Sequence, residues 1–425
     1  MTARVVRFLR ASGGVRASGL LLLGAAGVLG GAYAYNLLCI RWLGASDYGD
    51  VAALTALSTI MLLPLLGVQA ALAREVASYR ARGDDEAIGA LLRLTLRRTL
   101  LWGAAAAVVL TAFSPFITDV LNVSATASTF AAIVLAFSGT LLPLLQGFLQ
   151  GLERFGRIAF ALCVYGVARV LLTIPLLLAG LGVAGALTGA TFAGFAATAL
   201  ILVALANLLS SREQAAPTLH LKDFRPVIFG LFAFTVLTNA DVIVAKIFLD
   251  EHEAGTYASA SLVGKVAALL PAAVIAPVLL PRATSRIERG DDAAGIVSAA
   301  LVATAAFGLL LTSALAIVPT SLVEEVFGEQ FADARDLLAP CAAVMTLCGL
   351  INVNLTFAFA LRDRGLTRLM GIAIICQAGA FAFLHDGPYQ ILAATAFAAL
   401  VVIVPHELRS PVAVWRLLRP GFRRY

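Results

Sequence analysis

Twelve runs of apolar residues, each long enough to cross a lipid bilayer as a helix, follow one another along the chain. Short polar segments that carry most of the charged residues separate them. A membrane barrel would instead show weak alternation over strands of about ten residues. The pattern predicts an all-α polytopic membrane protein. We expect its transmembrane helices at residues 18–40, 51–73, 99–118, 130–151, 159–179, 184–207, 227–249, 257–280, 295–318, 337–360, 368–385 and 389–406.

The composition excludes an ordinary soluble enzyme and a disordered chain. Of the 425 residues, 60% are hydrophobic and 13% are charged, whereas a soluble domain is about half apolar and about a quarter charged. Four arginines before residue 18 imitate a secretory signal peptide. The apolar stretch that follows is too long for a signal core, so we interpret it as a retained first helix.

The net charge of +6 comes from basic residues in the loops and at the termini, not from a basic domain. Most of the 31 lysines and arginines lie in every second loop and at the two termini, whereas the acidic residues divide evenly between the two sides. The positive-inside rule therefore predicts cytoplasmic N- and C-termini. No segment is long enough to form a basic nucleic-acid-binding domain, so we expect membrane lipids and no nucleic acid as partners.

The two halves of the chain repeat each other. Leu62-Leu63-Pro64 precedes Arg82-Gly83-Asp84-Asp85, and Leu269-Leu270-Pro271 precedes Arg289-Gly290-Asp291-Asp292 at the same spacing. Six helices is an even number, so both halves enter the membrane in the same direction, related by a pseudo-two-fold axis along the membrane normal. We expect an N-terminal six-helix lobe at 1–210, a cytoplasmic linker at 211–226 and a C-terminal six-helix lobe with a basic tail at 227–425. Two such lobes are typical of alternating-access transporters, although channels and inert scaffolds are also duplicated.

Three charged residues lie well inside the predicted helices, away from their ends, where charge is costly and a functional role is the first hypothesis. Asp241 and Lys265 lie about twelve residues on either side of a turn near Glu253, so an antiparallel hairpin brings them to similar depth. We interpret Asp241 as an ion-coupling residue that exchanges a proton or cation, and Lys265 as substrate-binding. The alternative is a structural ion pair that locks the hairpin.

Arg169 is the third of these charges and lies near the middle of the fifth helix. The planar fork of donors on an arginine suits phosphate oxygens, so we interpret Arg169 as a substrate-binding residue that faces a central cleft. The alternative is a link to helix ends or polar side chains within the first lobe.

Four further residues are candidates on weaker grounds. Arg41 and Asn36, towards the end of the first helix, are included as substrate-binding, although snorkelling to the interface also explains Arg41. Pro64 and Pro271 occupy equivalent positions of the repeat, should kink their helices and are candidate hinges. The five cysteines lack the spacing of a metal site, so we expect no metal and no cofactor, with proton or sodium coupling as the alternative.

Two stretches carry a resemblance to a known family. They are Arg41-Trp42-Leu43-Gly44-Ala45-Ser46-Asp47-Tyr48-Gly49, and Asp241 followed by Ala254-Gly255-Thr256-Tyr257 and then Leu280-Pro281-Arg282. Both resemble the polysaccharide biosynthesis flippases of the multidrug/oligosaccharidyl-lipid/polysaccharide (MOP) exporter superfamily. The resemblance implies a MATE-like V-shaped transporter of twelve helices in two bundles, located in a bacterial plasma (inner) membrane.

The resemblance also implies a substrate. Such a flippase moves a polyprenyl-diphosphate-linked oligosaccharide across the membrane for cell-surface polysaccharide biosynthesis, with ion coupling. Glycosyltransferases or a polymerase of the same pathway are then candidate partners.

Three other functions remain as alternatives. A MATE-like drug or cation antiporter would need acidic cleft residues, whereas two of the three intramembrane charges here are basic. A membrane glycan-assembly enzyme needs a larger outward loop than 319–336, so we do not expect an enzyme. A non-transporting scaffold is the third alternative. No Walker motif points to ATP-driven export by this chain.

Overall fold

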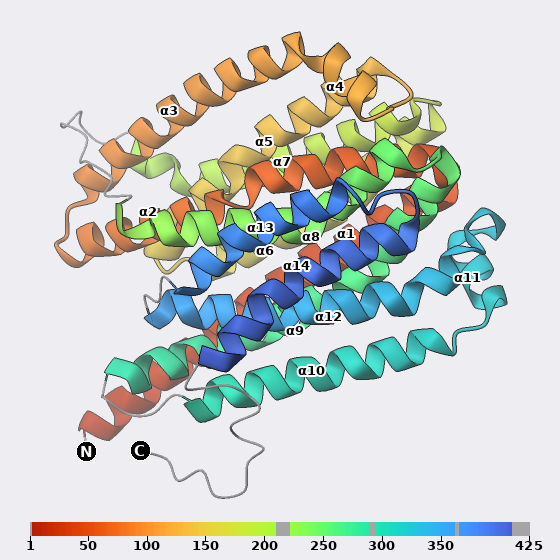
Figure 1. Cartoon of the computed structure of the whole chain (residues 1–425). Coiled ribbons are helices and arrows are strands. Elements are labelled where there is room, and N and C mark those ends of the chain that lie inside the picture. Colours follow the sequence, from red (N-terminus) through yellow and green to blue (C-terminus); the bar gives the residue numbers. More distant parts are fainter. Residues whose placement is uncertain (1, 210–221, 289–293, 362–364, 410–425) are drawn as a thin grey trace, which may run out of the picture. The chain divides into compact units, whose positions relative to one another are not determined.

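The computed structural model describes residues 2–209, 222–288, 294–361 and 365–409. Within these ranges the chain forms fourteen α-helices and two short 3₁₀ helices, joined by brief turns (Figure 1). The elements are α1 (Thr2–Leu62), α2 (Leu65–Ala81), α3 (Asp85–Ala112), α4 (Ser114–Val120), α5 (Thr126–Gly151), α6 (Phe155–Leu178), α7 (Gly182–Leu209), η1 (Lys222–Phe224), α8 (Arg225–Phe248), α9 (Glu251–Glu288), α10 (Ala294–Ala316), α11 (Thr320–Phe327), η2 (Glu329–Phe331), α12 (Ala334–Leu361), α13 (Gly365–Phe381) and α14 (Pro388–Arg409).

Each of the twelve predicted spans is helical over most of its length in this part of the chain. Nine helices of the described residues are long and apolar enough to cross a membrane. One of them, Leu22–Ala81, contains the first two predicted spans, and the predicted span at 368–385 coincides with the shorter apolar helix Gly365–Phe381. Large apolar side chains such as Leu101, Trp102 and Val108 are 61%, 70% and 70% exposed, as expected where lipid replaces water.

The long helix α1 bends at Gly44. The φ and ψ angles of this residue are 80° and −179°, a conformation that favours glycine. A Cβ atom at Gly44 would also lie only 2.7 Å from Oε1 of Gln330. The same oxygen accepts a hydrogen bond of 3.4 Å from the backbone N–H of Ala45. The backbone conformation therefore favours glycine here, and a larger residue would also have to displace the end of the Gln330 side chain.

The helices group into two compact units. The first consists of Met1–Leu38, Met61–Asp119 and Val123–Ile228, and the second of Cys39–Ile60, Val120–Asn122 and Phe229–Tyr425. Each unit has its own apolar core. The first core includes Leu72, Ile88, Leu145, Phe148 and Leu205, and the second includes Phe234, Leu237, Met345, Ile351 and Met370.

The predicted lobe and linker bounds stay a prediction. Most of the linker, the C-terminal tail after residue 409 and the second copy of the repeat motif at Arg289–Asp292 lie outside the described residues.

The two repeat-equivalent prolines differ in their effect. At Pro64 the helix is interrupted, because α1 ends at Leu62 and α2 begins at Leu65. The N–H groups of Leu66 and Gly67 instead donate to the carbonyls of Leu63 and Pro64, each at 3.0 Å. Pro271, by contrast, lies within the uninterrupted helix α9. A proline removes one helical hydrogen bond, and helices in membranes tolerate that loss. The helix is interrupted at Pro64 and not at Pro271, and the predicted kinks and both hinge roles stay predictions.

Candidate functional site

Arg169 lies near the middle of α6 with only 9% of its surface exposed. Its guanidinium carbon is 3.9 Å from the centroid of the Tyr35 ring in α1. Tyr35 is fully buried, so the stacked pair is part of the interior of the first unit. Because arginine keeps its proton in proteins, the first unit holds a fixed cation on an aromatic platform.

Small residues bring α1 and α6 close enough for this stack. The facing pairs are Gly24 with Ala159, Gly27 with Cys163 and Gly31 with Gly166. A Cβ atom on Gly31 would overlap the backbone of Gly166. Gly31 lies one helical turn before Tyr35, and Gly166 lies nearly one turn before Arg169. The glycine contact therefore sets the separation at which the tyrosine ring meets the guanidinium, as small residues do between membrane helices.

Asn36 follows Tyr35 in α1 and is partly buried. Its side-chain Nδ2 donates to the carbonyl of Ala32 at 2.8 Å, one turn back in the same helix. Such a local bond is the ordinary behaviour of a polar side chain in an apolar helix. The predicted substrate-binding role of Asn36 stays a prediction.

Asp241 is completely buried in α8, within the second unit. Its Oδ2 accepts hydrogen bonds from the Tyr257 hydroxyl at 3.0 Å and from Ser261 Oγ at 3.2 Å, both in α9. Its Oδ1 has no hydrogen-bond partner among the described residues. Buried polar atoms are almost always paired, and intramembrane carboxylates are typical of ion or proton pathways. The predicted ion-coupling role of Asp241 stays a prediction.

Lys265 belongs to the same hairpin but does not pair directly with Asp241. Its Nζ donates to Asn239 Oδ1 at 3.1 Å, and no ion pair within 4.0 Å links Lys265 to Asp241 in the described ranges. The direct ion pair considered from the sequence is therefore wrong. The hairpin turns at residues 249–250 rather than near Glu253, and this shift places Tyr257 and Ser261 level with the carboxylate instead. The substrate-binding role of Lys265 stays a prediction.

The buried ion pair of the second unit lies elsewhere. Lys246 Nζ of α8 is 2.7 Å from Asp50 Oδ1 of α1, and the two side chains are 3% and 1% exposed. In the sequence, Lys246 and Asp50 both stand near the ends of apolar runs, where a charged side chain usually reaches the membrane interface. Their pairing joins positions far apart in the chain, and no local pattern signals it. Tyr257 and Tyr35 are likewise not among the site residues predicted from the sequence, because no local pattern shows that they contact Asp241 and Arg169.

Arg41 is exposed and binds the C-terminal end of α11. Its Nε donates to the carbonyl of Val326 at 2.8 Å, in the last turn of α11. Nearby, Ser46 Oγ donates to Glu251 Oε2 at 2.6 Å, and the ring edge of Tyr48 packs on Phe331. An arginine at a helix C-terminus binds the terminal carbonyls favourably. This contact accounts for Arg41 structurally, and its substrate-binding role stays a prediction.

Comparisons with known proteins place this arrangement in a family. The model of the polysaccharide biosynthesis protein family matches residues 16–286. No protein of curated function matches the chain.

Solved structures match over nearly the whole chain. An inward-facing MATE-family multidrug resistance transporter of the MOP superfamily is 13% identical, with 92% of this chain and 98% of that chain covered and a TM-score of 0.67. A variant of the Vibrio cholerae MATE transporter VcmN is 14% identical, with 95% and 98% covered and a TM-score of 0.65. A MOP superfamily transporter from Pyrococcus furiosus is 14% identical, with 96% of each chain covered and a TM-score of 0.59.

At these identities the structures show the fold alone. They share the helical two-bundle fold of MATE transporters, in agreement with the all-α architecture and the apolar helices described above. The chain therefore belongs to the polysaccharide biosynthesis protein family, and it has the fold of MATE transporters together with helices long and apolar enough to cross a membrane.

Proposed function

We propose that this protein is a flippase that moves a polyprenyl-diphosphate-linked oligosaccharide across a bacterial plasma membrane by alternating access, for cell-surface polysaccharide biosynthesis. The family supports the pathway, and the basic loops support an orientation with both termini cytoplasmic. Membrane lipids and the glycosyltransferases or polymerase of that pathway are the proposed partners.

The observation that carries the proposal is the buried Arg169 stacked on Tyr35. Stacking occupies the face of the guanidinium and directs its N–H donors along the edge of the plane. That edge is the geometry for two parallel hydrogen bonds to a phosphate, and such charge-assisted bonds are about twice as strong as neutral ones. A polyprenyl diphosphate presents this chemistry within the membrane, where a drug cation would be repelled.

Flipping in proteoliposomes tests the proposal. A polyprenyl-diphosphate oligosaccharide is incorporated with the purified protein, and its accessibility to an added glycosidase is followed with time. Wild type should flip the lipid, and Arg169→Ala should slow flipping by about 10- to 100-fold, because hydrogen bonds to a charged group contribute about 1.5–3 kcal/mol. Arg169→Lys should lie between them, because it keeps the charge and loses the fork.

The matched control is Arg98→Ala, which removes the same charge from an exposed position of α3. It should flip at the wild-type rate. Folded Arg169→Ala protein that flips as fast as the control would contradict the role of Arg169. Folded wild type that flips none of several lipid-linked glycans would contradict the proposed function.

Asp241 is the proposed site of ion coupling. Its buried carboxylate, with Oδ1 lacking a partner in the described residues, is suited to take up a proton or sodium ion. Asp241→Asn should fold, because an amide accepts the bonds from Tyr257 and Ser261, and its transport should lose the response to imposed pH and sodium gradients. An Asp241→Asn protein whose transport still follows a gradient would exclude Asp241 as the coupling residue.

A MATE-like antiporter of organic cations is the second candidate, favoured by the same buried carboxylate and by the MATE fold. It predicts gradient-driven efflux of a cationic dye from the same proteoliposomes and no flipping of lipid-linked glycans. The two assays on one preparation therefore decide between the candidates.

A further inference from the structure

Two arginines at the start of α6 converge on a single carbonyl oxygen. Arg154 Nη1 and Arg157 Nη1 donate to the carbonyl of Ala204 at 2.9 Å and 2.8 Å. Ala204 lies in the last turns of α7, and Arg93 of α3 donates to the carbonyl of Leu209 at the end of that helix, at 3.2 Å. All of these residues belong to the first unit.

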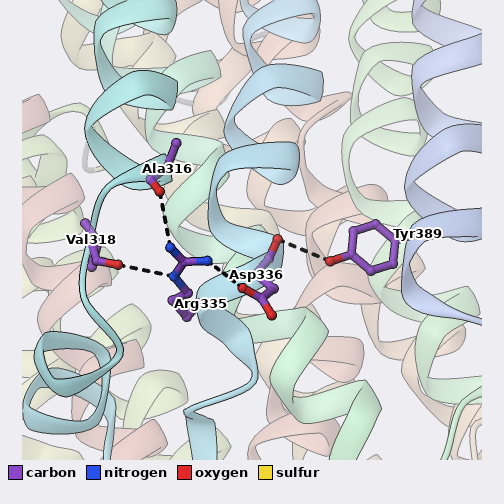
Figure 2. A network of polar contacts seen from close by, with 5 residues as sticks. All are labelled: Ala316, Val318, Arg335, Asp336 and Tyr389. Carbon is purple, nitrogen blue, oxygen red and sulfur yellow. Dashed lines mark hydrogen bonds and ion pairs between the residues drawn. The ribbon is translucent and has the colours of Figure 1, made fainter.

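Neither arginine of this pair has a carboxylate within 4.0 Å among the described residues. The adjacent Glu153 instead pairs with Arg80, at 3.0 Å. Arg335 of the second unit shows the usual arrangement (Figure 2). It donates to the carbonyls of Ala316, the last residue of α10, and Val318, just after it, and also to the Asp336 carboxylate at 2.7 Å. The Arg154–Arg157 pair also binds a carbonyl near the end of a helix, but it has no carboxylate beside it among the described residues.

Arg154 and Arg157 repel each other, and their positions in α6 are also unfavourable for cations. Arg154 is the N-cap residue of α6 and Arg157 lies in its first turn, where the helix dipole disfavours cations. Burial lowers the pKa of Arg154, and repulsion from Arg157 and Arg80 lowers it further, against a smaller opposing effect of Asp85. An anion between the two guanidinium groups would relieve both the repulsion and the unfavourable position.

The corresponding turn in the second half of the chain is also basic, but its arginines stand at other positions. The repeat that matches Leu152 with Leu361 and Gly156 with Gly365 aligns Arg154 with Asp363 and Arg157 with Leu366. The second half of the chain instead has Arg362 and Arg364, which stand on either side of the position aligned with Arg154. The pair is a property of this site rather than of the duplicated turn.

We propose that Arg154 and Arg157, at the C-terminal end of α7, bind the phosphate of a lipid headgroup at the membrane surface. Two guanidinium forks match the oxygens of a phosphate, and basic sites between transmembrane helices bind such headgroups. Exposed apolar side chains provide the adjoining surface for acyl chains. Phe160, 62% exposed, follows Arg157 by three residues and shares its face of α6, and Val203, 76% exposed, precedes Ala204.

Lipid binding to the full-length protein in detergent tests the site. Phosphatidylglycerol or phosphatidylcholine is titrated into wild type, and bound lipid is counted by native mass spectrometry. Wild type should retain phosphatidylglycerol preferentially. The double variant Arg154→Gln/Arg157→Gln should weaken its binding by about 10-fold or more, since hydrogen bonds between charged groups contribute about 1.5–3 kcal/mol.

The matched control is Arg97→Gln/Arg98→Gln, which removes the same charge from exposed positions of α3. It should change binding by less than about 2-fold, because exposed charges contribute little. An equal loss in both double variants, or no preference for phosphatidylglycerol in wild type, would overturn the proposal in favour of a diffuse basic surface. If the first double variant does not fold, Arg157→Lys keeps the charge without the fork and should still weaken binding.

Two further probes identify the source of the phosphate. A polyprenyl diphosphate that displaces phosphatidylglycerol from wild type and not from the double variant assigns the site to the lipid-linked substrate. Failure to displace it assigns the site to a membrane phospholipid. Inorganic pyrophosphate that displaces phosphatidylglycerol at the same concentration as the polyprenyl diphosphate would overturn the lipid assignment. None of these measurements depends on flipping, so the site and the proposed function fail separately.

Discussion

The side chains of Lys246 and Asp50 are 3% and 1% exposed, and Nζ of the lysine lies 2.7 Å from Oδ1 of the aspartate. Removing one partner of such a pair leaves an uncompensated buried charge, which costs about 3–5 kcal/mol. Asp50→Asn alone and Lys246→Met alone should therefore strongly lower the thermal unfolding temperature in detergent. The double variant should recover part of the loss, because it removes both desolvated charges.

The control for this prediction is Ser46→Ala, which removes the neighbouring exposed bond to Glu251. It should cost less than about 1 kcal/mol. If Asp50→Asn unfolds at the same temperature as Ser46→Ala, the buried pair contributes nothing to stability.

The ring of Tyr35 should matter more than its hydroxyl for Arg169. A cation–π contact is worth about 0.5–2 kcal/mol, depending on desolvation. In the flipping assay, Tyr35→Ala should therefore be about 2- to 30-fold slower than wild type, whereas Tyr35→Phe keeps the ring and should remain within about 2-fold. Equal rates for the two variants would exclude the ring as a platform for the guanidinium.

Single residues also show where sequence reasoning reaches its limit. Charge inside an apolar run is conspicuous, so Asp241 and Arg169 stand out from the sequence and are both buried in the structure. Asp50 and Lys246 stand at the ends of apolar runs, and this position looks the same whether a side chain snorkels to water or pairs inside the protein. Only the long-range packing that brings α1 to α8 separates the two cases.

The close packing of α1 against α6 depends on a seam of small residues, Gly24, Gly27 and Gly31 of α1 facing α6. Neighbouring glycines of α1 differ sharply in how much space surrounds them. A Cβ atom at Gly31 overlaps the backbone of Gly166, whereas nothing lies within 4 Å of a Cβ at Gly30. Gly31→Ala should push the helices apart, lower thermal stability and slow flipping through Arg169. Gly30→Ala should be neutral or slightly stabilising, because alanine favours the helix. A Gly31→Ala protein as stable and active as Gly30→Ala would show that the seam is not tight.

At the level of helices, the positions of the spans follow from the sequence and their registers do not. A bilayer requires about 20 apolar residues for each crossing, and such runs are visible without any tertiary information. The register of the α8–α9 hairpin depends on where its turn begins. A shift of that turn from Glu253 to residues 249–250 is enough to exchange Lys265 for Tyr257 and Ser261 beside Asp241.

For the whole molecule, the charge pattern makes a prediction about orientation. Ala81 ends α2 near the basic loop that precedes α3, and Glu329 lies in an acidic segment between α11 and α12. Both are exposed. In a background without the five native cysteines, Ala81→Cys should react with a membrane-impermeant maleimide only after cell lysis, and Glu329→Cys should react in intact cells. The opposite result would reverse the proposed topology.

The repeat predicts two similar halves from sequence alone, but it carries no information on a segment that joins the other half. Residues Cys39–Ile60 group with the second unit, although the chain on both sides of them belongs to the first. Contacts between residues so distant along the chain leave no local pattern. The structure alone reveals the grouping.

This grouping has a consequence for biogenesis. The partners of the segment in α8, α9 and α11 are encoded about 200 to 285 residues later, and Lys246, the counter-ion of Asp50, is among them. At a translation rate of about 10 residues per second, the Asp50 carboxylate waits about 20 s in the membrane before the ribosome delivers that lysine. A nascent chain in this interval has an incomplete second unit, because the helices from α8 onward are not yet made. We therefore expect the early half of the protein to reach its final packing only after the late half is made.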